Sequence, residues 1–170
     1  MKLMNWKLLL RAGAVFAFSG QANAQATQDI VVSATVPSFC LFDASSEDTM
    51  DFDLSGVATA TADFSATTTL VWRCSDGIDF DISISAGGSN DQGNRELDSG
   101  TAQLPYNLFT DDTYANIWGD GTGATDVVTV TGNGMGITGS TDVEGRILLG
   151  DAQAAEPDTY TDTVTVTITP

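Results

Sequence analysis

The sequence predicts an all-β protein, built as a sandwich of two packed sheets. Several segments alternate apolar and polar residues with the two-residue period of a strand, and no stretch of ten or more residues shows the 3.6-residue period of an amphipathic helix. Clusters of Gly, Asp, Asn and Ser separate these segments, as at 87–93 and 120–126, and such clusters are typical of turns. Six or seven short strands with this spacing favour two sheets packed face to face.

The clearest expected strand covers residues 160–169, where apolar and polar positions alternate with threonine. β-branched residues favour the pleated conformation, and the two-residue period places Val164, Val166 and Ile168 on one face. We expect that face to be buried.

Five further strands are expected along the chain. The alternating or continuous apolar segments lie at 67–74, 78–86, 104–109, 127–131 and 143–149. The stretch 57–69 is rich in Ala and Thr, and we interpret it as a loop that leads into the first of these strands.

The first 24 residues have the order of a secretory signal peptide. Basic residues come first (Lys2, Lys7 and Arg11), an apolar run follows at 12–18, and the small residues of 22–24 form the cleavage motif. The apolar run is much shorter than the roughly 20 residues that span a bilayer. We therefore predict a signal peptide at 1–24, cleavage before Gln25, and an exported mature chain without a membrane span.

The mature chain would be one strongly acidic domain. Its 146 residues suit a single core. Only three arginines oppose 23 acidic residues, which gives a net charge of −20. Nucleic acid and anionic membrane surfaces are therefore poor partners.

The two cysteines, Cys40 and Cys74, are predicted to form a disulfide, because an exported chain meets an oxidising compartment. A catalytic thiol would need a base, and the sequence contains no histidine. Without a metal motif or a nucleophile elbow either, we expect no enzymatic activity, no cofactor and no metal.

The segment 25–37, just after the predicted cleavage site, alternates in the same way as a strand. Ile30, Val32, Ala34 and Val36 share one face, which could fill a groove in another sheet. The same pattern also fits an ordinary first strand of the chain's own domain, because periodicity does not say which sheet a strand joins.

Two other features offer an alternative function. Carboxylate clusters could supply the oxygen ligands of calcium, although solubilising surface acids and turn formers are the favoured explanation: Asp51 and Asp53; Asp76, Asp79 and Asp81; Asp120 and Asp126. Trp72 and Trp118 could stack on sugars, although large aromatic residues of a sandwich usually pack in the core. The alternative is thus a monomeric, secreted carbohydrate- or calcium-binding β-sandwich module.

Several local patterns also follow one another in a distinctive order. They are the alternating segment before Cys40, "LVWRC" at 70–74, "REL" at 95–97, "YNLF" at 106–109, "WGDG" at 118–121, "GRI" at 145–147 and "YTDTVTV" at 160–166. In this order, which covers nearly the whole mature chain, they resemble the spore coat U domain, the fold of subunits of archaic, Csu-type chaperone-usher pili. Two departures are Asp158, where the family usually has glycine, and Pro170, where it often ends on an aromatic residue.

The resemblance implies an immunoglobulin-like β-sandwich that lacks its final strand and is completed by a donor strand. A periplasmic chaperone would lend a strand first, and the N-terminal segment of the next identical or related subunit would replace it at an outer-membrane usher. By matching positions, 25–37 would be the donor segment, with Ile30, Val32, Ala34 and Val36 as donor residues. Residues 38–170 would be the pilin domain, with Val164, Val166 and Ile168 bordering the acceptor groove. The implied role is that of a cell-surface fibre subunit that supports adhesion and biofilm formation.

Overall fold

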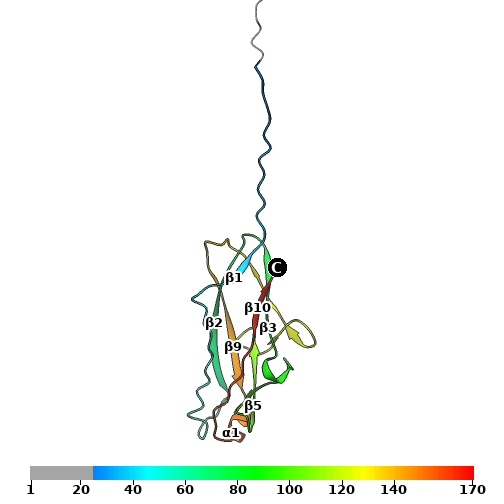
Figure 1. Cartoon of the computed structure of the whole chain (residues 1–170). Coiled ribbons are helices and arrows are strands. Elements are labelled where there is room, and N and C mark those ends of the chain that lie inside the picture. Colours follow the sequence, from blue (N-terminus) through cyan, green and yellow to red (C-terminus); the bar gives the residue numbers. More distant parts are fainter. Residues whose placement is uncertain (1–24) are drawn as a thin grey trace, which may run out of the picture. The chain divides into compact units, whose positions relative to one another are not determined.

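The computed structural model describes residues 25–170, and the predicted signal peptide lies outside the described residues. The chain divides into two compact units, and the second, from Val36 to Pro170, contains every strand of residues 25–170 (Figure 1). Within residues 25–170, no helix has the length and apolar character needed to cross a membrane.

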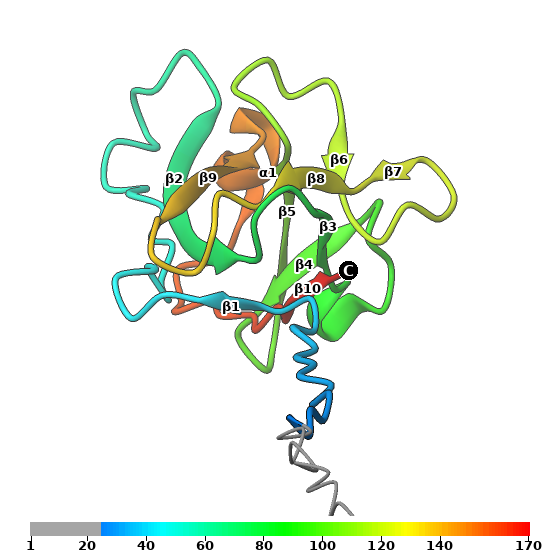
Figure 2. The ribbon, with the colours of Figure 1, turned by 90° about the horizontal axis from the view of Figure 1, so that it is seen from above.

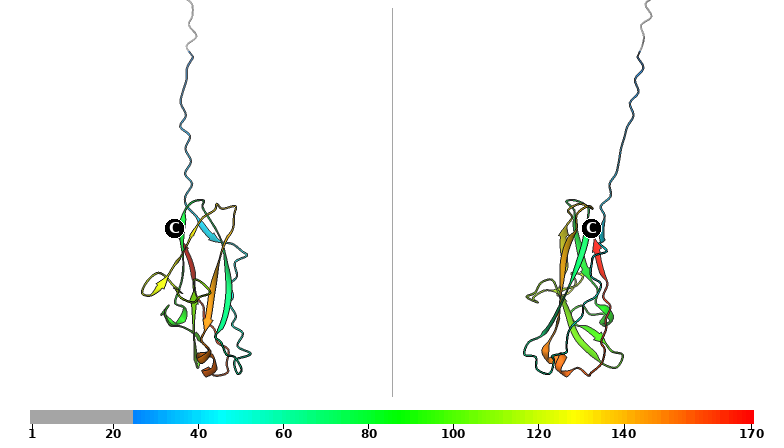
Figure 3. Two further views of the ribbon diagram at one scale, coloured as in Figure 1. Left: turned by 180° about the vertical axis from the view of Figure 1, so that it is seen from behind. Right: turned by 90° about the vertical axis from the view of Figure 1, so that its left-hand side faces the viewer.

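The second unit is a sandwich of two sheets, which confirms the all-β prediction. The larger sheet has the order β1-β2-β9-β5-β6-β7, with β4 also paired to β5, and the smaller sheet has the order β10-β3-β8. Figure 3 shows the two layers from behind and from the side, with β9 in one and β10 in the other.

The strands and helices of the domain follow one another in this order along the chain. They are β1 (Cys40–Phe42), β2 (Phe64–Cys74), β3 (Asp79–Ile84), the 3-10 turn η1 (Gly87–Ser89), β4 (Arg95–Asp98), β5 (Gln103–Phe109), β6 (Ile117–Trp118), β7 (Thr125–Asp126), β8 (Val128–Thr131), β9 (Gly139–Ile147), α1 (Leu149–Ala154) and β10 (Val166–Thr169).

The core lies between the two sheets and is filled by alternate residues of the longer strands. Leu70 and Trp72 come from β2, Ile82 and Ile84 from β3, and Val143 from β9. The burial of every second residue is the expected consequence of the strand period.

Three of the predicted strands have clearly different bounds in the structure, and the short strands β1, β4, β6 and β7 were not predicted. β2 begins at Phe64, inside the stretch interpreted as a loop, because its small residues pair with β9. β9 ends at Ile147, and the next residues turn into α1, where the carboxylate of Asp63 accepts a hydrogen bond from Leu149 N at 2.9 Å. β10 covers only the last four residues of the strand expected at 160–169.

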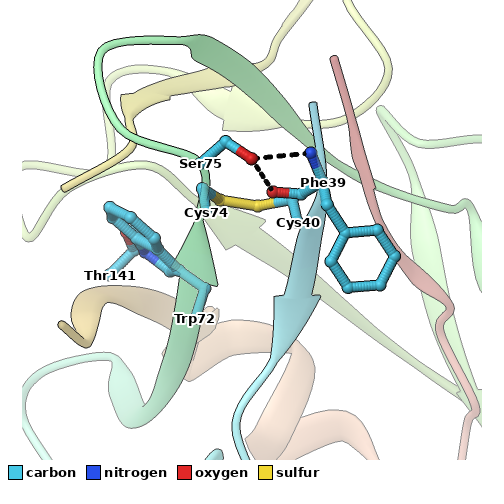
Figure 4. Close-up of a disulfide and its surroundings, with 6 residues drawn as sticks. All are labelled: Phe39, Cys40, Trp72, Cys74, Ser75 and Thr141. Carbon is cyan, nitrogen blue, oxygen red and sulfur yellow. Dashed lines mark hydrogen bonds between the residues drawn. A yellow bond between two sulfur atoms is a disulfide. The ribbon is translucent and has the colours of Figure 1, made fainter. Parts of the chain in front are cut away.

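The disulfide expected between Cys40 and Cys74 is present and joins β1 to β2 (Figure 4). The two cysteines lie directly opposite each other in the ladder. Beside them, Phe39 N donates to Ser75 Oγ and Ser75 N donates to Phe39 O, both at 2.8 Å. The short β1 is thus held to β2 by a covalent bond as well as by backbone hydrogen bonds.

Removal of this disulfide should strongly destabilise the domain. The bond closes a loop of 34 residues, and the chain-entropy relation gives a loss of about 4 kcal/mol in the free energy of unfolding for the double variant Cys40→Ala/Cys74→Ala. Urea denaturation followed by tryptophan fluorescence measures it. A loss below about 1 kcal/mol would show that β1 is held by its other contacts.

Candidate functional site: a groove between two edge strands

An open apolar groove of about 470 Å³ lies along one side of the domain. Its walls are the segment 42–52, which follows β1, and the segment 162–166, which leads into β10. Core side chains of both sheets reach its floor: Leu70, Ile84, Tyr106, Leu108 and Val143.

The groove is too large to be a packing defect. Protein interiors are close-packed, and their few voids are about the size of a water molecule. The space of 470 Å³ is instead an open groove at the surface, with core residues at its floor.

β1 and β10 lie side by side at this groove (Figure 2). Each is the terminal strand of its own sheet, and the two belong to different sheets. A terminal strand has one edge without a neighbour, and its backbone N–H and C=O groups can pair with an added strand. The groove therefore combines an apolar floor with an available strand edge.

The first wall is held against β2 by a row of hydrogen bonds. Asp43 N donates to Val71 O at 2.7 Å, and Glu47 N donates to Thr69 O at 3.0 Å. Further along, Phe52 packs on the core, with its ring centroid 6.4 Å from that of Tyr106 in an edge-to-face arrangement. This wall extends the line of β1 although it forms no regular ladder.

The second wall keeps the alternation expected for 160–169. Every second side chain from Tyr160 to Ile168 is half-buried, and the threonines between them are exposed. Thr165 O accepts from Ser85 N at 2.9 Å, and Thr165 N donates to Ser85 Oγ at 2.8 Å. Because backbone groups of successive residues point to opposite edges of a strand, those of Val164 and Val166 point away from β3, to the free edge.

Val164 and Val166, two of the three residues predicted to border a groove, line this one, and Ile168 lies beyond its lining. The predicted donor residues lie in the first unit and at the start of the second. They form no strand, and the side chains of Ile30, Val32 and Val36 are 82%, 89% and 89% exposed.

Arg95 is the most unusual buried residue of the domain. Its side chain is fully buried, and its guanidinium donates to Ser85 O and Trp118 O at 2.8 Å and to Asn107 Oδ1 at 2.7 Å. Burial lowers the pKa of Arg95, and the nearby Asp162 carboxylate acts in the opposite direction. The arginine thereby connects β4, β5 and β6 of one sheet to the end of β3 in the other.

Asp162 and Tyr106 form a second polar contact where the groove meets η1. The Tyr106 hydroxyl donates to Asp162 Oδ2 at 2.7 Å, and Gly88 N donates to Asp162 Oδ1 at 2.9 Å. Burial, together with the neighbouring Asp162 carboxylate, raises the pKa of Tyr106, so the hydroxyl keeps its proton as a donor.

Sequence reasoning did not identify this network. Arg95, Asn107, Trp118 and Asp162 each lie in one of the distinctive sequence patterns, but those patterns are far apart in the sequence. One signal was available, because Arg95 is one of only three arginines after the predicted cleavage site.

The features that suggested sugar or calcium binding find little support. Trp118 is fully buried and Trp72 is 5% exposed, so neither ring offers a face to a sugar. Within the described part of the chain, no three Asp, Glu, Cys or His residues are grouped as metal ligands would be.

Comparison with known proteins identifies related sequences and folds. A model of the Spore Coat Protein U domain family matches residues 26–167. The chain is also similar to a chain in the crystal structure of the CsuC–CsuE chaperone–tip adhesion subunit pre-assembly complex from archaic chaperone-usher Csu pili of Acinetobacter baumannii, with a TM-score of 0.55 and 21% identity. That match covers 79% of the present chain and 40% of the other, so the present chain spans less than half of its length. No curated protein matches the sequence.

Replacement of Arg95 by lysine should destabilise the domain even though the charge is kept. A lysine ammonium cannot reproduce the forked donors, and each buried carbonyl left unpaired costs about 1–3 kcal/mol. We expect Arg95→Lys to lower the free energy of unfolding by at least 3 kcal/mol on that scale, measured by urea denaturation.

The matched control is Arg73→Lys, which changes a half-exposed arginine that is paired with Asp43. It should cost less than about 1 kcal/mol, as is usual for exposed ion pairs. Equal losses in the two variants would contradict the role assigned to the Arg95 network.

Proposed function

Because the chain belongs to the Spore Coat Protein U domain family, we propose that it is a structural subunit of a chaperone-usher pilus, polymerised by donor-strand exchange. The observation that carries the proposal is the apolar groove beside a free strand edge, in a chain that also has an exposed, alternating apolar segment. In this proposal the groove accepts an added strand, and residues 25–37 of another subunit supply that strand.

The physical basis is strand addition. Backbone hydrogen bonds supply affinity, and alternate side chains that enter the groove supply specificity. Full burial of a valine or isoleucine side chain contributes about 1.5–3 kcal/mol, so several such residues together form a stable junction.

The order of the donor segment and the domain along the chain makes the contact between subunits head-to-tail. The donor residues precede the domain whose own groove accepts the donor segment of the next subunit. A contact between two different surfaces that does not close on itself produces a fibre. The proposed parts are a signal peptide at 1–24, a donor segment at 25–37 and a pilin domain at 38–170.

The groove also accounts for the proposed partners. Before assembly it would expose core residues to water, so a periplasmic chaperone would occupy it with a strand of its own. The next identical or related subunit would displace this strand at an outer-membrane usher, and the finished fibre would lie on the cell surface. Its proposed role there is adhesion and biofilm formation, which is structural and involves no catalysis.

A single charge on the groove-facing side of the donor segment should block assembly. Val32→Asp would bury an unpaired carboxylate, at a cost of several kcal/mol. We expect the yield of SDS-resistant multimers from periplasmic expression with the cognate chaperone and usher to fall at least tenfold.

Val31→Asp is the matched control, because Val31 is the neighbouring residue with the opposite orientation. Its side chain would face solvent in the fibre, and multimers should form at the normal yield. Loss of assembly in both variants would contradict the assignment of faces, and assembly of Val32→Asp would contradict the donor role.

Deletion of 25–36 distinguishes the pilus subunit from a monomeric binding module. A pilus subunit without the segment should still bind the chaperone but form no multimers in gel filtration and electron microscopy. A stable monomer of the full mature chain that unfolds after the deletion would show that the segment completes its own sandwich, and the proposed function would then be wrong.

A further inference from the structure

The wall of the groove formed by 162–166 has one charged residue among its half-buried positions, and the other wall carries Glu47 and Asp48. Among the half-buried positions of 160–169, Asp162 lies between Tyr160 and Val164. Its carboxylate is fixed by the Tyr106 hydroxyl and by Gly88 N, and a Cβ atom at Gly87 would collide with it. The carboxylate therefore cannot move aside when a strand enters the groove.

The direction of an entering strand follows from the chain connections, given the proposed function. β10 runs toward the end of the domain where β1 begins (Figure 1). A donor strand parallel to β10 would carry its own domain to that same end, where residues 36–39 of the acceptor already enter β1. An antiparallel donor leaves at the opposite end, which is free for the next domain.

The connection to the donor's own domain is short. Only residues 37–39 separate Val36 from Cys40, and three extended residues span about 10 Å. The domain of the donor subunit must therefore lie close to the end of the acceptor groove from which its strand leaves. The register of the strand thus also sets the distance between the two domains.

Few registers are available. In an antiparallel pair, directly opposite residues share a face, so the apolar residues of the donor can shift only in steps of two. The residue opposite Asp162 is thus Ala34, one of its two neighbours on the same face (Val32 or Val36), or a more distant residue of that face.

We propose that the donor segment of a second copy of this chain lies antiparallel to 160–169 with Ala34 opposite Asp162, and that the Asp162–Tyr106 pair fixes this register. Ala34 is the smallest of the four donor residues. Its methyl group would therefore remove less water from the Asp162 carboxylate than a larger apolar side chain would. Ile30 and Val32 then face Val166 and Val164, the apolar positions of the groove wall.

The neighbouring registers fit less well. With Val32 or Val36 opposite Asp162, a larger apolar side chain would remove water from the carboxylate. With Val36 in that position, Ala34 would also leave a void at Val164. A shift in the same direction by two more residues would place Pro37, which has no N–H, inside the paired strand. It would also leave Ile30 beyond Val166.

Cysteine pairs between subunits test the register directly. Opposite residues of a hydrogen-bonded pair lie about 5.5 Å apart at Cα, within the range of a disulfide, whereas diagonal neighbours lie about 7–8 Å apart, outside it. Val32→Cys should therefore cross-link with Val164→Cys in assembled fibres after mild oxidation, and at least tenfold less with Val166→Cys. Each single-cysteine variant is the control for exchange with the native disulfide.

The outcomes separate this inference from the proposed function. Multimers whose cross-link forms with Val166→Cys would overturn the register and leave donor-strand exchange intact. No multimers from any variant, nor from the unmodified chain, would overturn both.

A second variant tests the role of Asp162 itself. Ala34→Leu should reduce the yield of multimers at least tenfold, because the larger side chain meets the fixed carboxylate. Ala26→Leu, in the polar start of the same segment, should assemble normally. Full assembly of Ala34→Leu would overturn the role of the Asp162–Tyr106 pair even if the cross-link has the expected register.

Discussion

The buried guanidinium of Arg95 connects the two sheets of this domain, together with the hydrogen bond from Trp118 Nε1 to Ile82 O. It donates to backbone oxygens at the ends of β3 and β6, in different sheets, and to Asn107 in β5. A buried charge is tolerated only when its hydrogen bonds are made, so any sliding of one sheet over the other would leave the arginine unpaired. In the proposed function the sandwich lacks a strand until a donor enters, and such a constraint then matters more, because the absent strand cannot hold the layers together.

The same constraint keeps the groove open. A sandwich with a strand missing from one edge could collapse, since apolar floor residues such as Leu108 and Val143 gain by leaving water. Asp162 and Tyr106 line the groove, and Arg95 donates to the backbone oxygen of Ile84, one of the residues at its floor. They fix the walls at the separation that an added strand would need. In the proposed function, strand addition depends on a domain that keeps the groove open before the donor strand enters.

The sequence predicted the fold class well because strands with one buried face leave a two-residue pattern, as in β3 and β5. The sequence predicted the first and last residues of a strand less well, because these depend on whether a neighbouring strand lies alongside. Residues 160–165 alternate as clearly as β10 but have no continuous neighbour, and Phe64 extends β2 because β9 lies beside it. Val164 and Val166 were found from periodicity. Arg95 and Asp162 were not, since their roles depend on oxygens brought together from distant parts of the chain.

The disulfide has a mechanical meaning if the chain forms part of a fibre. A pulling force would enter the domain through residues 36–39 and reach Cys40 first. β1 is only three residues long. Without the disulfide, the pulling force could break the hydrogen bonds between β1 and β2 one after another. The bond from Cys40 to Cys74 passes the load directly to the eleven-residue β2, which is paired along most of its length with β9. Tension would then act on many hydrogen bonds in shear, which must break together.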